Sequence, residues 1–457
     1  MRARLQTLLA RVADADLREV VRGGAVALAV RVGGTAFNFA FLWMVARTLG
    51  AEGTGLYALA SSVVVLATVL GVLGLDQALV RFVAEAAERG RPGLVRGYVR
   101  QGATYALAAS LGVTLVGWVL APVLAARVFR DPELGTPLRY MLLAVPFVVA
   151  AQVRSGGLQG LRRIRDAQLV SVFALGAGTC LAFLALVGLA QATGGAVQVT
   201  QAAGAYTFGA AAACALGVGL WRRHAPRPPA PFEPAQPSEP AVGRSLLQTS
   251  LPMLWVASML LVNTWSAVFL LGLYADAADV GLYNVALRLA MLTSFVLAAV
   301  NSIAAPKFAA FNARGDYAAM ERVAVRSAQL TTAVAAPLLL LLILAAPWCM
   351  GVFGAEFVAG AGVLVVLAVG QFVNVAAGSV GQVLAMTGHE RDLRTVIVVS
   401  AALNVAGCLV LIPRFGALGA AAATAAAWGV MNGLCVWYAR RRLGIGTHAG
   451  VRLGGAR

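Results

Sequence analysis

Residues 55–82 read GLYALASSVVVLATVLGVLGLDQALVRF, and residues 281–308 read GLYNVALRLAMLTSFVLAAVNSIAAPKF, 226 positions later. Both stretches begin with Gly-Leu-Tyr and end with a basic residue followed by phenylalanine. The same shift, without a gap, relates further basic positions such as Arg96 and Arg322. The chain therefore reads as a duplicated, mostly apolar unit of roughly 220 residues, a common construction plan of membrane transporters.

The composition excludes a soluble protein. Of 457 residues, 60% are hydrophobic and 12% are charged, and the mean hydropathy is +0.81. A soluble domain of this length could not cover so much apolar surface, so we expect a polytopic membrane protein. The net charge of +17 lies in short loops between hydrophobic spans, which membrane topology explains without a nucleic-acid partner. The five cysteines all lie in apolar runs without metal-ligand spacing, so we expect buried thiols and no metal site.

Twelve stretches of the chain are apolar enough to cross a bilayer, which takes about 20 residues of helix. The predicted fold class is an all-α polytopic membrane protein with two six-helix lobes. Because each half holds an even number of crossings, the two repeats are parallel, related by an axis along the membrane normal. The predicted spans are roughly 22–47, 54–80, 99–127, 137–160, 168–190, 200–221, 245–274, 280–305, 326–352, 357–386, 394–413 and 416–438.

Basic residues set the predicted orientation, because loops rich in Lys and Arg stay in the cytoplasm. With the N-terminus inside, most of the 36 basic residues fall in cytoplasmic segments, including Arg89, Lys307 and Arg440. We therefore expect both termini to be cytoplasmic.

The predicted domain organisation follows from these spans. Residues 222–244 hold seven of the 17 prolines and read as an extended cytoplasmic linker between the lobes. The remaining segments are a cytoplasmic interfacial segment (1–21), an N-terminal six-helix lobe (22–221), a C-terminal six-helix lobe (245–438) and a basic cytoplasmic tail (439–457).

Two arginines, Arg31 and Arg288, lie deep within predicted spans. At roughly 1.5 Å per residue, Arg31 is about 13 Å from the cytoplasmic end of its span and Arg288 about 12 Å from the outer end of its span. A charge at such depth costs roughly 2.5–3.5 kcal/mol on insertion scales, so it should face the protein interior or a water-filled cavity. Because guanidinium suits phosphate, we interpret both as binding an anionic, phosphorylated substrate. A structural ion pair or snorkelling to an interface is the alternative interpretation.

These two charges are not duplicated. At the shift of the repeat, Arg31 corresponds to Ala257 and Arg288 to Ser62. Such asymmetry suits a cavity for a substrate that is anionic at one end. A third arginine, Arg154, lies only about seven residues from the inner end of its span, so we expect its side chain to snorkel.

Asp76 is the acidic residue that lies clearly within a predicted span. It could pair with Arg31 on the adjacent span, since both lie in the cytoplasmic half of the membrane. It could instead bind a proton or cation. The structural pair is the interpretation that we favour.

Amide side chains within the spans are candidates for a polar cavity. Hydroxyl-rich substrates such as sugars need hydrogen-bond donors and acceptors, but polar groups also join membrane helices to one another. For any one amide the second explanation is preferred, whereas as a set they fit a cavity. The candidates are Asn38, Asn263, Asn284, Gln371, Asn374 and Gln382.

Catalytic motifs are not evident in the sequence. We find no Walker motif, nucleophile elbow or zinc-ligand pattern. The sequence therefore predicts that the protein is not an enzyme.

Two stretches carry a resemblance to a known family. Residues Arg47–Phe82 resemble the N-terminal signature of bacterial polysaccharide biosynthesis proteins, and Asp279–Phe308 is similar to the corresponding region of their second half. These are Wzx-type oligosaccharide flippases of the multidrug/oligosaccharidyl-lipid/polysaccharide (MOP) exporter superfamily. The resemblance implies a MATE-like fold with a central cavity that opens alternately to each side of the bacterial inner (plasma) membrane. It implies translocation of an undecaprenyl-diphosphate-linked oligosaccharide, with Arg31 and Arg288 as the candidates for holding the diphosphate.

The resemblance also implies partners and leaves alternatives open. The implied partners are the lipid-linked glycan, membrane lipids, and the glycan polymerase and glycosyltransferases of the same pathway. No cofactor is implied beyond a coupling proton or sodium ion. A lipid II flippase is one alternative, but such flippases usually carry two helices more than the twelve spans predicted here. A multidrug or small-solute antiporter would need an acidic ion site, for which Asp76 is the candidate. A membrane glycosyltransferase or polymerase is disfavoured because the predicted outer loops are short.

Overall fold

The structure is a computed structural model that describes residues 2–226 and 242–450, and within these ranges it is helical without a β-strand. Most of the predicted linker and the last residues of the predicted tail lie outside the described residues. The α-helices are α1 (Arg2–Val72), α2 (Leu75–Glu88), α3 (Pro92–Val123), α4 (Gly135–Leu142), α5 (Val145–Gly160), α6 (Ile164–Gln168), α7 (Leu175–Thr193), α8 (Val199–His224), α9 (Val242–Tyr274), α10 (Ala277–Ala290), α11 (Ser294–Arg314), α12 (Tyr317–Leu344), α13 (Ala346–Gly351), α14 (Ala361–Ala377), α15 (Val380–Met386) and α16 (Glu390–Leu443).

Ten helical segments of the described chain are long and apolar enough to cross a membrane. Two of them, Ala29–Glu88 with 60 residues and Glu390–Leu443 with 54 residues, are each long enough for two crossings at about 20 residues per crossing. Each predicted span overlaps one of the ten segments. The protein is therefore an all-α, multi-pass membrane protein, and the number of twelve crossings stays a prediction.

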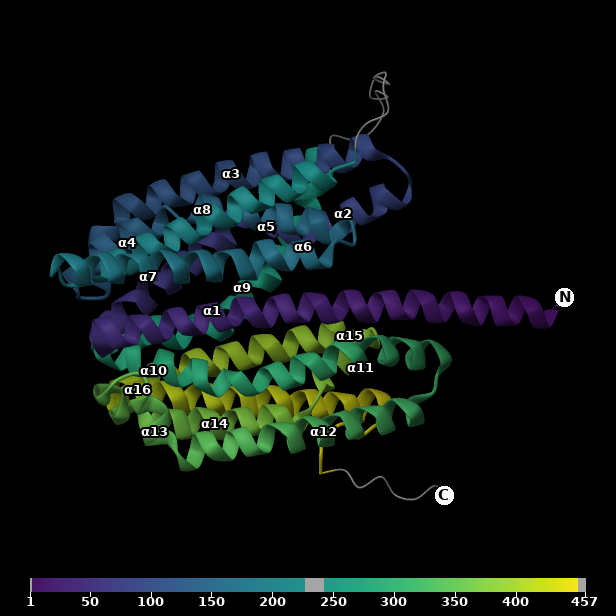
Figure 1. Ribbon diagram of the computed structural model, residues 1–457. Helices are drawn as coiled ribbons and strands as arrows, with labels where there is room; N and C mark the ends of the chain where they lie inside the picture. Colours follow the sequence, from purple (N-terminus) through teal and green to yellow (C-terminus); the bar gives the residue numbers. More distant parts are fainter. Residues whose placement is uncertain (1, 227–241, 451–457) are drawn as a thin grey trace. The chain divides into compact units, whose positions relative to one another are not determined.

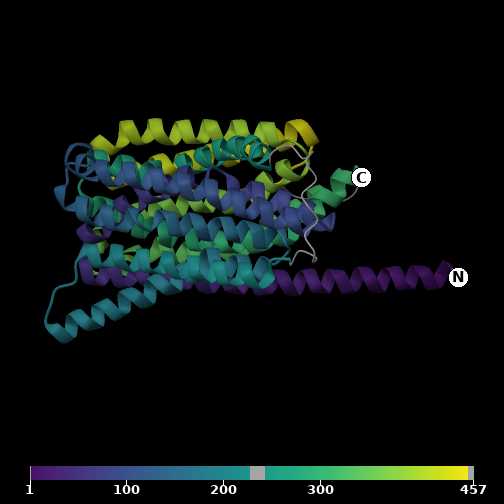
Figure 2. The ribbon, with the colours of Figure 1, turned by 90° about the horizontal axis from the view of Figure 1, so that it is seen from above.

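Glycines divide the two longest helices. Gly50 in α1 has φ 70° and ψ −169°, and Gly416 in α16 has φ 52° and ψ −132°; both conformations are non-helical. A positive φ favours glycine because it has no Cβ. At Gly416 the chain reverses, so the two halves of α16 pack against each other, and Ser400 Oγ donates to the carbonyl of Ala427 at 3.0 Å. Figure 2 shows α16 as yellow-green and yellow segments that run alongside each other.

The helices form two compact units (Figure 1). In unit 1, α5 packs against α2 and α8, and α8 also packs against α4 and α7. In unit 2, α14 is central and contacts α10, α12 and α16. Unit 1 comprises Met1–Phe41, Val64–Pro122 and Gly135–Trp255, and unit 2 comprises Leu42–Val63, Val123–Leu134 and Val256–Arg457. Two short segments of the first half of the chain thus belong to unit 2, whereas the sequence predicted contiguous lobes.

The repeated Gly-Leu-Tyr motifs contact each other inside unit 2. A Cβ on Gly55 would overlap the backbone carbonyl of Ala277, and a Cβ on Gly281 would overlap the backbone carbonyl of Ala51. The pattern Ala-x-x-x-Gly therefore occurs on both helices, and each copy packs against the other. Small residues at this spacing let two membrane helices approach closely.

Candidate functional site

Arg288 lies in a polar and aromatic setting on α10 of unit 2. It is exposed, although Leu287 and Leu289 beside it are buried. Its guanidinium carbon Cζ lies 5.8 Å from the centre of the Trp265 ring, close enough for a cation–π interaction. Tyr57 is also near enough to interact with it electrostatically. Among the side chains that the structure describes, no carboxylate forms an ion pair with Arg288.

Arg31 lies on α1 in unit 1 and is also exposed. Its backbone carbonyl accepts a hydrogen bond from Thr35 Oγ1 at 2.9 Å. Helix α1 packs closely nearby, because a Cβ on Gly34 would lie 2.8 Å from the Cα of Phe173. In the part of the chain that the structure describes, Arg31 has no ion-pair partner. Both arginines thus lie deep within predicted spans without an ion-pair partner among the described side chains.

Asp76 lies near the start of α2 and is half-buried. Its Oδ2 accepts a hydrogen bond from Gln77 Nε2 at 3.3 Å. The described residues contain no ion pair between Asp76 and Arg31. The structure therefore does not supply the pairing that the sequence suggested for this carboxylate.

Two of the predicted amides, Gln371 and Asn374 on α14, are brought together in unit 2. Asn374 Nδ2 donates to Gln371 Oε1 at 3.0 Å, and Ser294 Oγ donates to the same oxygen at 3.4 Å. Asn432 Nδ2, on the second half of α16, donates to Asn374 Oδ1 at 3.1 Å. The chain of hydrogen bonds joins helices α11, α14 and α16, which favours the helix-joining interpretation for these two amides.

Asn263 on α9 belongs to a second network in unit 2. The amide of Asn404 on α16 donates to the carbonyl of Asn263 and to Ser266 Oγ, each at 3.2 Å. Thr424 Oγ1 donates to Asn404 Oδ1 at 3.4 Å, and Tyr283 shares a hydrogen bond of 2.9 Å with Thr424. Asn404 is 1% exposed, so this network ties α9 and α10 to both halves of α16 in an interior where unpaired polar groups would be costly.

The remaining candidates lie on separate helices. Asn38 Nδ2 donates to the carbonyl of Gly34 at 3.0 Å in unit 1, whereas Asn284 is buried on α10 and Gln382 is half-buried on α15 in unit 2. Arg154 Nη1 donates to the carbonyl of Ala150 at 2.8 Å. This contact lies on its own helix.

Several interacting residues were not identified from the sequence. Trp265 and Tyr57 beside Arg288 were missed because an aromatic residue in a span gives no signal of its own. Asn404 and Asn432 carried the same signal as the predicted amides, a polar side chain inside an apolar run, and that signal could have found them. In the described residues, no group of three or more His, Cys, Asp or Glu could hold a metal ion.

Two curated proteins are similar to parts of the chain. Stage V sporulation protein B of Bacillus subtilis (strain 168) is 31% identical over 129 residues, which are 28% of this chain and 25% of that protein. The probable low-salt glycan biosynthesis flippase Agl15 of Haloferax volcanii is 27% identical over 176 residues, 38% of this chain and 37% of that protein. The chain thus spans well under half the length of both relatives.

The fold resembles that of a solved transporter. An inward-facing multidrug resistance MATE family transporter of the MOP superfamily superposes with a TM-score of 0.72 at 15% identity, covering 92% of this chain and 98% of that one. At this identity the likeness shows the fold, which confirms the predicted MATE-like architecture. The sequence profile of the family described as "Polysaccharide biosynthesis protein" matches residues 20–312. Because this match covers more than half of the sequence, the chain belongs to the polysaccharide biosynthesis protein family.

Proposed function

We propose that the protein is a flippase that moves a lipid-diphosphate-linked oligosaccharide across the plasma membrane of a bacterium by alternating access. The observation that carries the proposal is Arg288, a cation deep in a predicted span that lies near Trp265 and Tyr57 and has no ion-pair partner among the described side chains. A cation there is costly without an anionic partner. A diphosphate headgroup would supply that partner.

The relatives support transport of a glycan over catalysis. The family is described as polysaccharide biosynthesis proteins, and the relative in Haloferax volcanii is named as a probable glycan biosynthesis flippase. Arg31 on α1 of unit 1 is the second candidate contact for an anionic headgroup. The glycosyltransferases of the pathway would act before this step and the glycan polymerase after it, and the step would be driven either by a proton or sodium gradient or by the substrate gradient itself.

The proposal is tested with purified protein in proteoliposomes that contain undecaprenyl-diphosphate-linked oligosaccharide. Arg288→Ala and Arg31→Ala are each expected to slow flipping by about tenfold or more, because a hydrogen bond to a charged group contributes about 1.5–3 kcal/mol. Arg288→Lys keeps the charge but loses the paired donors, so it should recover only part of the rate. Arg154→Gln is the matched control, since Arg154 bonds to its own helix.

Normal flipping by the Arg31→Ala/Arg288→Ala double variant would show that the arginines do not hold the substrate. The antiporter alternative makes a different prediction, in which Asp76→Asn abolishes ion-coupled solute transport while both arginine variants retain it. A membrane glycosyltransferase would instead form transfer products in the same vesicles.

A further inference from the structure

The chain turns back into unit 2 after the end of α16. Helix α16 ends at Leu443, and Gly444 has a left-handed φ of 70°, which changes the direction of the chain. The next three residues are buried, with Ile445 3% exposed and Thr447 0% exposed. We call Gly444–Ala449 the strap. A solvated tail would leave these residues exposed, so the strap is packed against other parts of unit 2.

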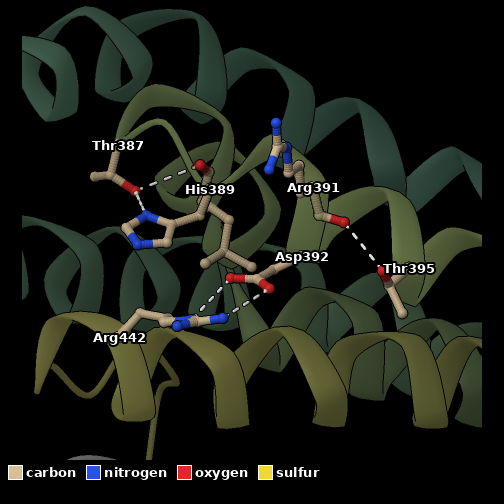
Figure 3. Close-up of polar contacts among 7 residues, drawn as sticks. Thr387, His389, Arg391, Asp392, Thr395 and Arg442 are labelled. Atoms are coloured by element: carbon tan, nitrogen blue, oxygen red, sulfur yellow. Dashed lines mark hydrogen bonds and ion pairs between the residues drawn. The ribbon is translucent and has the colours of Figure 1, made fainter.

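An ion pair fixes the start of the strap. Arg442, two residues before Gly444, donates to both carboxylate oxygens of Asp392, from Nε at 3.0 Å and from Nη2 at 3.2 Å. Figure 3 shows this paired contact between the two ends of α16. A two-point contact of this kind sets orientation as well as distance. It therefore fixes the last turn of α16, after which the strap begins.

Ile445 anchors the strap in an apolar seat. It packs in a buried cluster with Phe308 of α11, Ala324 of α12 and Val383 of α15. Because its side chain leaves water on seating, this contact favours the docked strap. The cluster that contains Ile445 joins α11, α12 and α15 at this end of unit 2.

The first half of the chain fills the equivalent space in another way. At the shift of 226 residues, Phe308 corresponds to Phe82, and Ala324 corresponds to Tyr98. In unit 1, Phe82 stacks on Tyr98 with ring centroids 5.1 Å apart and an interplanar angle of 28°. The second half lacks this aromatic ring, and Ile445 from the strap supplies the missing packing.

A second difference between the halves provides a hydrogen-bond acceptor for the backbone of the strap. Glu321 of α12 corresponds to Val95, which is fully buried in unit 1. Glu321 Oε1 accepts a hydrogen bond from the backbone N–H of Gly446 at 2.7 Å. A buried apolar residue in one half is thus a hydrogen-bond acceptor for the strap in the other.

A third difference lies between α14 and α15. Helix α14 ends at Ala377, and Gly378 follows with φ 69° and ψ −144°, whereas the equivalent Gln152 lies inside the continuous helix α5. A helix end leaves carbonyls without intrahelical partners. The carbonyl of Ala376 accepts instead from the strap, through the N–H of Ala449 at 2.9 Å.

The hydrogen bonding around the docked strap is less complete than in a typical protein core. Thr447 Oγ1 in the strap and Ser379 Oγ at the helix break are buried without a hydrogen-bond partner among the residues that the structure describes. Buried hydroxyls without partners oppose docking. The docked strap therefore combines favourable anchors with unfavourable contacts, as a reversible attachment requires.

We propose that the strap is a detachable device of unit 2. Seated, it supplies the packing that Tyr98 gives to unit 1 and holds α15 against α11 and α12. Released, it frees α15 to move. This inference goes beyond the proposed function, and its test does not depend on transport.

The test is hydrogen exchange with mass spectrometry on the full chain in lipid nanodiscs. Ile445→Asp removes the apolar anchor, and Ala324→Tyr fills its seat with the side chain that unit 1 uses. Both variants should speed exchange of the strap amides by about tenfold or more. With Ile445→Asp, exchange of the α15 amides should rise as well. Arg440→Gln changes an exposed residue one turn before the strap begins. This control should leave the exchange rates of the strap amides and of the α15 amides unchanged.

A double variant separates the strap from general damage. Ala324→Tyr combined with Ile445→Ala should restore slow exchange in α15 while the strap stays released, because the ring replaces Ile445. If Ile445→Asp fails to fold, strap exchange in Ala324→Tyr and α15 exchange in the Ala324→Tyr/Ile445→Ala double variant still test the proposal. Fast exchange of the strap in the wild-type protein, or unchanged α15 exchange after strap release without the added ring, would overturn the proposal.

Discussion

Gly55 and Gly281 show how a residue without a side chain fixes a helix contact. Each would place a Cβ into the backbone of the opposite helix. Backbone atoms within a helix cannot move aside as a flexible side chain would. The contact therefore depends on both glycines.

Gly55→Ala and Gly281→Ala should each destabilise the protein by about 1–3 kcal/mol or more, because they overpack a backbone contact. The measurement is the thermal unfolding midpoint of the purified protein in detergent. Gly112→Ala on α3 is the control, since a Cβ there meets nothing within 4 Å and alanine is the better helix former. Equal midpoints for Gly55→Ala and Gly112→Ala would contradict the close contact.

Residue identity selects candidates for the site but does not predict the partners of those residues. Arg31 and Arg288 stood out because a charge in an apolar run is rare and costly. The partners of Gln371 and Asn374 could not be predicted, because Ser294 and Asn432 reach them from helices distant in the sequence. Sequence spacing on one helix gives no information about such contacts.

Gly416 marks the point where one long helical stretch becomes two helices. Asp279 of α10 accepts a hydrogen bond from the backbone N–H of Ala417, the first residue after the break. The start of a helix carries unpaired N–H groups and a partial positive charge, which a carboxylate satisfies. The break in α16 is thus held by a residue from another helix.

Asp279→Ala should remove this cap and lower the free energy of unfolding by about 0.5–2 kcal/mol. Asp276→Ala is the matched control, because the exposed Asp276 lies one turn away and its side chain makes no capping hydrogen bond at the start of α10. Chemical denaturation of the two variants in the same detergent gives the comparison. Equal losses would mean that the Asp279 carboxylate does not support the break.

Element positions followed from the sequence where apolar runs are long. The predicted spans overlap the helices of the structure because about 20 apolar residues have few other stable states in a bilayer. The buried strap was not predicted, since Gly444–Ala449 is short and follows three arginines. Its burial depends on Ala324 and Gly378, whose meaning appears only when the two halves are compared in space.

For the molecule as a whole, the distribution of Arg and Lys predicts one orientation. Alkaline phosphatase, which is active only outside the cytoplasm, should be active when inserted at Gly195, between α7 and α8. It should be inactive when inserted at Gly315, between α11 and α12. The positive-inside rule gives this direction. Activity at Gly315 would reverse the predicted topology and place both termini outside.

The two halves of the chain share a plan but differ in the residues that carry special contacts. Arg31 and Arg288 each lack a charged counterpart, and Tyr98 and Val95 are replaced by residues that receive the strap. A duplicated scaffold can therefore support unequal tasks. The unshared residues include the two arginines proposed to hold the substrate and the residues that contact the strap.

The contact between the repeated motifs also has a symmetry of its own. Gly55 faces Ala277 and Gly281 faces Ala51, so the same pair of residue types meets twice in reversed roles. This reciprocity is the defining property of a twofold dimer interface. The contact between these two helices is thus locally twofold symmetric, because exchanging one copy of the motif for the other leaves the same pair of contacts.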